Sequence, residues 1–337
     1  MTTLKDVAAL AGVTATTASR ALRGLDSVTP KTTKRVIDAA KKLGYRMNVS
    51  ARSLKSGRSG IVTFLTSGIE GTYFSSLAMR FSRELSRHGM QMLIQTSRFS
   101  ADVIDANDLS FALSDGIITI NAHGFDDMLE RFPSVVLEDY APDRPFDRVN
   151  APSESGARAA VRHLAEQGCR TIALLGGDIP RDPSRAASQE VRLIAARDEI
   201  RKLGLPEPVD SLFVKTAWSL DGAVEAGRRL ADAVIHGGLP FDGIFCPSDG
   251  LAIGLMRGLA DRSVRVPDSL LVMGFDGLTE GEYGVPSLST VLPDYDGMVE
   301  SAVSLLLKRI EHPDAPAFPQ TVNVGYRLLA RESTAHR

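Results

Sequence analysis

The chain has few of the features that mark exported, membrane-spanning or disulfide-bonded proteins. Its 337 residues include only two cysteines, Cys169 and Cys246, which lack the spacing of a metal site or a redox pair. No run approaches the roughly 18 uninterrupted apolar residues that span a bilayer. The N-terminal M-T-T-L-K-D-V has no apolar signal core of roughly 7–15 residues. These absences predict a cytoplasmic protein with two unpaired thiols.

Signatures of common enzymes are also missing. The sequence has no G-x-G-x-x-G, no P-loop and no H-E-x-x-H, and its six histidines are scattered. We therefore expect no catalytic residue, no metal site and no cofactor.

Charge is distributed unevenly along the chain. Residues 1–58 hold twelve Lys or Arg and three acids, a net charge of +9. The other 279 residues hold 27 basic and 38 acidic groups, a net charge of −11, so that the whole chain is close to neutral at −2. A basic head on an acidic body predicts that the head binds a polyanion such as nucleic acid.

Three short helices are predicted in the head. The first spans about Leu4 to Ala11 and ends at Gly12. The second has Thr14 as its N-cap and runs to about Leu22. The third begins with Thr29 as N-cap and Pro30 at its first position, and it ends at Gly44. The residues expected to face inward on the third helix are Val36, Ile37, Ala40 and Leu43.

The second of these helices is built almost entirely from small side chains. Short helices can cross closely only where the contacting side chains are small, as in a helix-turn-helix. We expect Val13, Ala18 and Leu22 to face the core. Those expected to face a DNA groove are Ala15, Thr16, Ser19 and Arg20. An ordinary three-helix domain is the alternative, and it does not explain the charge.

The segment after the head, residues 45–60, reads Y-R-M-N-V-S-A-R-S-L-K-S-G-R-S-G. Alone it is too short and polar to form a stable helix, because helix nucleation is costly. We expect it to fold on DNA, with Arg52 and Lys55 near phosphates or the minor groove and Leu54 as an apolar wedge between base steps.

From Ile61 onward, short apolar runs alternate with helical patterns. The runs lie at 61–65, 92–94, 116–120, 135–137, 172–175, 244–246 and 270–273. The helical patterns lie at 77–88, 156–167, 191–203 and 220–236. This alternation predicts parallel sheets covered by helices on both faces, in two similar α/β subdomains. Ligands of such sheets bind beyond the carboxyl ends of the strands.

Several ordered motifs share the spacing of one known family. The head contains L-K-D-V-A-A-L-A-G-V-T-A-T-T-A-S-R-A-L and K-L-G-Y-R-M-N-V-S-A-R-S-L-K. The body contains four further blocks, at 156–177, 248–255, 266–276 and 285–291. On these motifs the chain resembles the lactose-repressor/galactose-repressor (LacI/GalR) family of bacterial transcription regulators from end to end.

The resemblance implies an all-α helix-turn-helix head and hinge helix joined to an α/β periplasmic-binding-protein-like core of two parallel-sheet subdomains, with three crossings between them. The head would span 1–46, the hinge helix and linker 47–60, and the effector-binding and dimerisation core 61–337. Within the core, the N-subdomain would hold about 61–157 and 290–320, and the C-subdomain about 158–289 and 321–337.

The resemblance also implies roles for individual residues. Base-reading positions match Thr16 and Arg20, phosphate contacts match Thr14, Thr17 and Ser19, and the minor-groove wedge matches Leu54. The full set expected at DNA is Thr14, Ala15, Thr16, Thr17, Ser19, Arg20, Asn48, Arg52, Leu54 and Lys55. The set expected at the effector is Tyr73, Phe74, Arg192, Trp218, Ser248 and Asp276. Aromatic faces combined with charged groups suit a sugar or similar polyol.

The sequence departs from the family pattern in four places, one of which is the loop before Tyr73, where the usual Asn-Pro is missing. Met47 stands where the family usually has proline, and Ala195-Ala196 stand where it has glycine and an aromatic. The C-terminal A-R-E-S-T-A-H-R lacks a leucine-heptad tail, so a homodimer is expected rather than a dimer of dimers.

Together the residues and the resemblance predict a ligand-responsive repressor that binds a pseudo-palindromic DNA operator and a small effector, most simply a carbohydrate. Three alternatives stay open at this stage. The effector can be a nucleobase or another metabolite; the body can be that of a solute-binding protein; or it can be an α/β enzyme fused to a DNA-binding head.

Overall fold

The structure is a computed structural model of the chain. It describes residues 2–22, 28–45, 58–66, 71–96, 111, 113–120, 126–177, 187–207, 212–236, 238–313 and 318–335. In this part of the chain, no helix combines the length and the apolar composition needed to span a bilayer.

The head is a bundle of three helices, α1 (Leu4–Ala11), α2 (Ala15–Leu22) and α3 (Pro30–Lys42), as the sequence predicts. The Thr14 hydroxyl accepts a hydrogen bond from the Thr17 amide at 3.1 Å, and Thr29 caps α3 through the Thr32 amide at 3.4 Å. Small residues dominate the core that the three helices share: Val7, Ala8, Ala11, Ala18, Ala21, Val36, Ala39 and Ala40.

One predicted core position of the head is wrong. Ile37 is 38% exposed, whereas Val36, Ala39 and Ala40 are buried. The inward face of α3 follows three- and four-residue steps from Val36, and Ile37 lies about a quarter-turn away from that line. Val13 and Leu22 pack against the edge of the core, and Ala21 occupies its interior.

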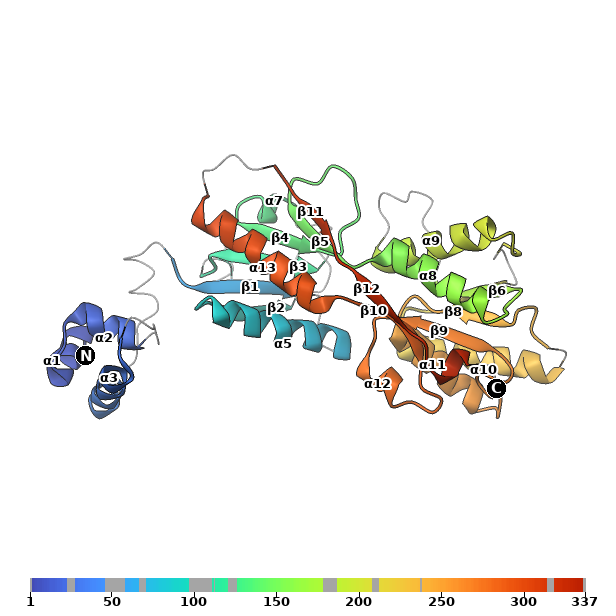
Figure 1. The fold of residues 1–337 in the computed structure, drawn as a ribbon, viewed down its shortest axis with the longest axis horizontal. Helices are drawn as coiled ribbons and strands as arrows, with labels where there is room; N and C mark the ends of the chain where they lie inside the picture. The colour runs from blue at the N-terminus through green and yellow to red at the C-terminus, as the bar shows by residue number, and fades with distance from the viewer. Residues whose placement is uncertain are drawn as a thin grey trace.

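The first subdomain of the core is built on a six-stranded, all-parallel sheet (Figure 1). Its strands, in spatial order, are β11 (Thr321–Asn323), β5 (Asp147–Asn150), β4 (Ser134–Leu137), β3 (Gly116–Ile120), β1 (Ile61–Thr66) and β2 (Gln91–Thr96). Helices α5 (Thr72–Arg87) and α13 (Tyr295–Glu311) pack together on one face. The short helix α7 (Asp126–Leu129) contributes Leu129 to the apolar cluster on the other face.

The second subdomain repeats this plan. Its strands, in spatial order, are β12 (Tyr326–Leu329), β10 (Ser289–Pro293), β9 (Leu271–Phe275), β8 (Gly243–Phe245), β6 (Ile172–Gly176) and β7 (Phe213–Lys215). All neighbouring pairs are parallel except β10 with β12. Helices α8 (Ser153–Glu166) and α9 (Ser188–Lys202) cover one face, and α10 (Leu220–His236) and α11 (Asp249–Ala260) cover the other. Two short elements, α12 (Thr279–Glu282) and the 3-10 helix Glu332–Thr334, complete it.

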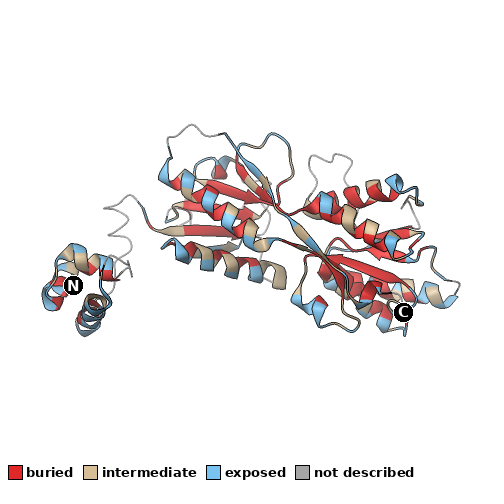
Figure 2. Cartoon of the chain, viewed as in Figure 1, coloured by how far each residue is buried: buried red, intermediate tan, exposed pale blue. Residues whose placement is uncertain are grey.

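The strands of both sheets are mostly buried between these helix layers, as Figure 2 shows. Burial on both faces explains why the sequence reads as continuous apolar runs rather than as alternating ones. The predicted architecture of a helical head and two parallel-sheet subdomains is confirmed.

The chain passes between the subdomains at three described places: 150–153, 293–295 and 323–326. These crossings bond to one another, because the Val324 amide donates to the Asn150 carbonyl at 3.0 Å and the Asp294 amide donates to the Gly325 carbonyl at 2.9 Å. They also correct the expected boundaries by a few residues. Most of β10 lies in the range expected for the N-subdomain but pairs in the second sheet, while β11 pairs in the first sheet.

Candidate functional site

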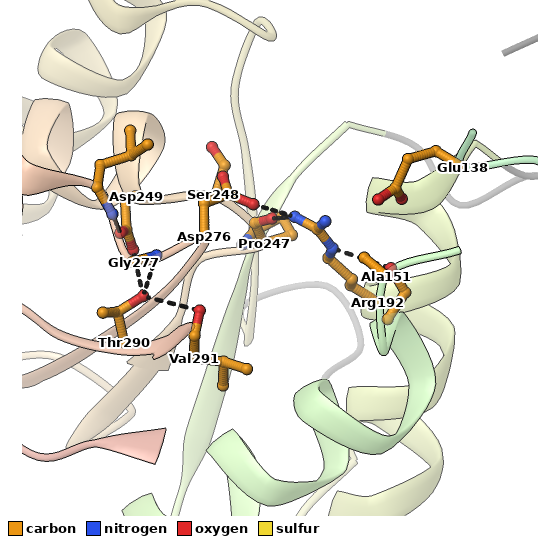
Figure 3. A network of polar contacts seen from close by, with 12 residues as sticks. Glu138, Ala151, Arg192, Pro247, Ser248, Asp249, Asp276, Gly277, Thr290 and Val291 are labelled. Carbon is orange, nitrogen blue, oxygen red and sulfur yellow. Dashed lines mark hydrogen bonds and ion pairs between the residues drawn. The ribbon is translucent and has the colours of Figure 1, made fainter. Parts of the chain in front are cut away.

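Ionisable side chains gather where strands of both sheets end at the junction of the subdomains. Glu138 directly follows β4 of the first sheet, and Asp276 directly follows β9 of the second. Arg192, from the second turn of α9, reaches the same place (Figure 3). All three side chains are almost fully buried, with 5%, 6% and 4% of the residue exposed.

Arg192 is the centre of this cluster. Its Nη1 donates to the Asp276 carboxylate at 2.9 Å and to the Pro247 carbonyl at 2.8 Å, and its Nε donates to the Ser153 hydroxyl at 3.2 Å. The guanidinium also lies 3.8 Å from the centre of the Phe275 ring, a cation–π contact. Ser153 is the first residue of α8 and ends the first crossing between the subdomains. Arg192 is therefore hydrogen-bonded directly to that crossing.

Burial and charge act in opposite directions on this ion pair. Burial alone would lower the pKa of Arg192, but the Asp276 and Glu138 carboxylates outweigh it and hold that pKa above its ordinary value. Burial raises the pKa of Asp276 to about 6, even though Arg192 favours the ionised form. The junction therefore contains a permanent cation and a carboxylate that is held out of water.

A second buried carboxylate fixes the loop that carries Asp276. Asp249, fully buried, accepts the Leu278 amide at 2.7 Å and the Thr290 hydroxyl at 2.6 Å. The same hydroxyl accepts the Gly277 amide at 3.2 Å. Asp276 has φ of +121°, a conformation that non-glycine residues rarely adopt, and these bonds hold the loop in that strained geometry. Asp249 thus fixes the position of Asp276 through the residues that follow it, Gly277 and Leu278.

Three tyrosines surround the ion pair. The Tyr295 hydroxyl donates to the Asp276 carbonyl at 3.0 Å, and the Tyr73 ring lies 6.0 Å from the Tyr295 ring. The Tyr140 hydroxyl lies 2.9 Å from Glu138 Oε2 and 2.8 Å from the Ser153 hydroxyl. Burial raises the pKa of all three phenols, so they are neutral hydrogen-bonding groups at ordinary pH.

The predicted effector residues fall into three groups in the structure. Arg192 and Asp276 are in direct contact, and Tyr73 and Phe74 pair edge to face at 5.1 Å beside them. Ser248 caps α11 by accepting the Leu251 amide at 3.2 Å. Trp218 lies in the loop before α10 and is 46% exposed. Its role stays a prediction.

Sequence reasoning missed five members of the cluster: Glu138, Tyr140, Ser153, Asp249 and Tyr295. Glu138 had a usable signal, because it is the first residue after a buried parallel strand and ligands bind beyond the carboxyl ends of such strands. Tyr140 follows on the same loop, and Asp249 lies inside the 248–255 block, but its role in the cluster was not recognised there. Ser153 and Tyr295 lie at the crossings, where no short motif marks them.

In the head, α2 presents a short polar face. Thr16 and Arg20 are both exposed and lie one helical turn apart, on the same side of α2. Thr14 is exposed at the start of the helix, while Ala15, Thr17 and Ser19 are half-buried. Four residues predicted to contact DNA lie outside the described residues: Asn48, Arg52, Leu54 and Lys55.

Comparisons with known families match both parts of the chain. Residues 3–48 match the model of bacterial regulatory proteins of the lacI family, and residues 161–334 match that of the periplasmic binding protein-like domain. The ribose operon repressor of Halalkalibacterium halodurans is 30% identical over 340 residues, covering 99% of this chain and 97% of the relative. The transcriptional repressor PurR of Actinobacillus pleuropneumoniae is 26% identical over 343 residues, covering 99% and 98%.

Solved structures of transcription regulators are also similar to this chain over its whole length. A complex of the transcriptional regulator CelR with cellobiose has a TM-score of 0.71 at 26% identity and covers 99% of this chain and 100% of its own. The lac repressor dimer bound to operator and an anti-inducer has a TM-score of 0.76 at 23% identity, covers 99% of both chains, and is similar in fold.

Replacing Asp249 by asparagine tests the electrostatics of the cluster. Burial, with a further contribution from Asp276, raises the pKa of Asp249 to about 7. A carboxylate with a higher pKa in the folded chain than in the unfolded one binds protons more tightly when folded, so its contribution to stability falls as pH rises from about 4 through 7. Asp249→Asn does not titrate, so its Tm should rise relative to wild type by about 2–4 °C or more between pH 5 and pH 8, measured by differential scanning fluorimetry.

Asp261→Asn is the matched control. A hydrogen bond from Arg228 holds the pKa of Asp261 below its ordinary value, so this carboxylate is ionised throughout that pH range. Its Tm difference from wild type should be constant from pH 5 to pH 8. The same constancy for Asp249→Asn would show that Asp249 is not a buried, proton-binding group.

Proposed function

The chain belongs to the LacI family of ligand-responsive transcriptional repressors, and on that premise we propose that a small carbohydrate bound at the subdomain junction sets its affinity for a pseudo-palindromic operator. The observation that carries this proposal is the buried Arg192–Asp276 pair, with Glu138 approaching from the other subdomain. A ligand that replaces some of these contacts acts on both subdomains at once.

The crossings couple such a ligand to the angle between the subdomains, and through that angle to the head. Arg192 bonds Ser153 at the first crossing, and the hydroxyl of Tyr295, in the second crossing, bonds the Asp276 carbonyl. A change at the ion pair therefore shifts the angle between subdomains, and with it the spacing of the two heads in a dimer. A tenfold change in operator affinity needs only about 1.4 kcal/mol of difference in ligand affinity between the two states.

The chemistry of the cluster supports a carbohydrate. A buried guanidinium, two carboxylates and a serine hydroxyl offer the charged and polar partners that sugar hydroxyls use, and aromatic rings beside them suit the C–H faces of a sugar ring. The ribose operon repressor and the cellobiose-bound regulator are relatives with sugars in their names. A nucleobase is the second candidate, favoured by the adjacent rings of Tyr73, Phe74 and Tyr295.

For the head, we propose that α2 enters the major groove with Thr16 and Arg20 at base edges. Arginine can bind guanine through two hydrogen bonds, and Thr14, Thr17 and Ser19 are short enough to bring the backbone close to phosphates. With Ala15 at the start of the helix, few long side chains reach the bases, so the predicted hinge helix would add specificity by bending the DNA.

We further propose that the protein is a homodimer joined along one side of both subdomains. Apolar side chains are exposed there on α5 and β2 and in the loop after α12: Met79, Leu93, Ile94, Tyr283 and Val285. The two patches adjoin, because the Thr72 hydroxyl at the start of α5 bonds the Glu280 carboxylate of α12 (Figure 1). Val285 is 98% exposed and lines a groove of about 750 Å³, a site that a second copy would fill.

Two arginine substitutions should separate the functions of head and core. Arg20→Ala should weaken binding to DNA selected from a random library by about 1–3 kcal/mol, with little effect on random DNA, and should leave effector binding intact. The effector is first identified by a thermal-shift screen of sugars and nucleobases, because a ligand that binds the folded protein raises its Tm. Arg192→Ala should still bind DNA, but its DNA affinity should no longer change when that effector is added. Fluorescence anisotropy of labelled DNA, with and without that effector, measures both.

Each variant has a control that removes a similar charge elsewhere. Arg35→Ala takes a cation from α3 and should affect selected and random DNA equally; Arg162→Ala breaks an ion pair with Glu199 away from the junction and should leave the response unchanged. A fully responsive Arg192→Ala protein would remove Arg192 from the effector site.

The dimer is tested by charging its proposed surface. Tyr283→Asp combined with Val285→Asp should convert a dimer to a monomer in sedimentation equilibrium, because two carboxylates would have to be buried for association. Phe318→Asp, which charges an equally exposed apolar residue (91%) near β11, should remain dimeric. A double variant that dimerises as strongly as wild type would place the interface elsewhere.

A further inference from the structure

The chain that arrives from the head is fixed to the first sheet by Asp115, the residue before β3. Its carboxylate accepts the Ser59 amide at 2.7 Å, the Ser59 hydroxyl at 2.9 Å and the Gly60 amide at 2.7 Å. The Asp115 amide in turn donates to the Ile61 carbonyl at 2.8 Å, at the start of β1. The entry of the chain into the core is therefore held at the amino-terminal edge of the sheet.

Arg58, one residue earlier, reaches the C-terminal end of α13. Its Nη2 donates to the Ile310 carbonyl at 2.8 Å, across 252 positions of sequence. The last carbonyls of a helix have no partner within the helix, and that end carries partial negative charge, so a guanidinium there supplies both a donor and a favourable charge. The direction in which the linker leaves the core therefore depends on the position of α13.

The C-terminal half of α13 is tightly joined to the first sheet. Arg309 forms a two-pronged ion pair with the buried Asp147 of β5, at 2.7 and 2.9 Å. A methyl group added at Gly116 of β3 would lie 2.9 Å from Leu306 and 3.1 Å from Ile310, so the helix approaches the strand as closely as packing allows. This end of α13 therefore moves with the sheet and with the entry of the chain.

The other end of α13 lies at the junction of the subdomains (Figure 1). The Asp294 amide bonds the Gly325 carbonyl at 2.9 Å, and the Tyr295 hydroxyl bonds the carbonyl of Asp276 in the second subdomain at 3.0 Å. The helix has 17 residues and is about 25 Å long. A rotation of about 5° at the junction therefore moves the end that Arg58 holds by about 2 Å.

We propose that Arg58 is a positioning residue that couples the head to the effector: its bond to Ile310 makes the linker follow α13, whose first turn is held beside the ion pair by Tyr295. The inference rests on the proposed function and identifies a contact through which the response leaves the core. When the Arg58 side chain is removed, Asp115 still holds the entry of the chain, but α13 no longer directs the linker. Both binding sites survive, and the coupling free energy between them falls.

The first test measures effector affinity and coupling separately in the full chain. The probes are ribose, cellobiose, adenine and guanine, and the one that raises the Tm of the wild type is used. Arg58→Met keeps a long side chain but removes its donors, so its Kd for the probe in isothermal titration calorimetry should stay within about twofold of wild type. The change in operator Kd that the probe causes should shrink at least about fivefold, because couplings between sites typically amount to about 5–150-fold.

Two variants control for charge and for folding. Lys308→Met removes an exposed cation from the last turn of the same helix, so it should weaken DNA binding by a similar electrostatic amount and keep the full response. Arg58→Lys keeps a cation and a donor and should respond more strongly than Arg58→Met. A fully responsive Arg58→Met protein beside an unresponsive Arg192→Ala protein would overturn this coupling role and leave the effector site in place.

The second test needs no effector and holds even where none of the four probes binds. Tyr295→Phe and Arg58→Met alter opposite ends of α13, and substitutions so far apart normally have effects that add within about twofold in affinity. Their joint effect on the Kd for library-selected DNA, measured by fluorescence anisotropy, should instead depart from additivity by at least about fivefold. Tyr295→Phe combined with Lys308→Met should be additive. Additivity of Tyr295→Phe with Arg58→Met would show that α13 does not carry the response to the linker.

Discussion

A guanidinium that is taken out of water has to be held by protein groups, since an isolated buried charge is too costly for a folded protein to retain. Arg192 is in that position, with only 4% of its surface exposed. Its partners are a carboxylate, a backbone carbonyl, a serine hydroxyl and an aromatic face, and they come from separate segments of the chain. The need to satisfy one cation therefore brings α9, the end of β8, the end of β9 and the first crossing together.

The strained residues around the junction follow from the same requirement. Asp276 meets Arg192 only from a backbone conformation that is rare for aspartate, and Asp249 and Thr290 hold it there through the amides of Gly277 and Leu278. Asp249 in turn is ionised only at a cost, because burial raises its pKa to about 7. A site assembled from such mutually dependent groups has few intermediate arrangements. A ligand that exchanges for one contact therefore changes the balance between whole conformations rather than adjusting one side chain.

The sequence predicts the parts of this architecture that depend on local rules. Caps at Thr14 and Thr29, and apolar runs for strands buried on both faces, place most helices and strands within a few residues. Ile37 shows the limit of a helical pattern, because adjacent apolar residues such as Val36 and Ile37 cannot both face inward. Arg192 and Asp276 came from the family resemblance rather than from any local rule. Tyr140 and Ser153 could not be found in this way, since the hydrogen bond between them joins the loop after β4 to the first crossing, and no local pattern predicts that contact.

The most direct test of the central role of the ion pair is a double-mutant cycle. The free energy of unfolding of the full chain is measured by chemical denaturation for Arg192→Met, for Asp276→Asn and for the two together. Each single change leaves a buried charge without its partner of opposite charge and should cost about 3–5 kcal/mol. The double variant removes both charges, so it should be at least about 2 kcal/mol more stable than the sum of the single effects implies. Simple additivity of the two substitutions would show that the Arg192–Asp276 interaction does not organise the junction.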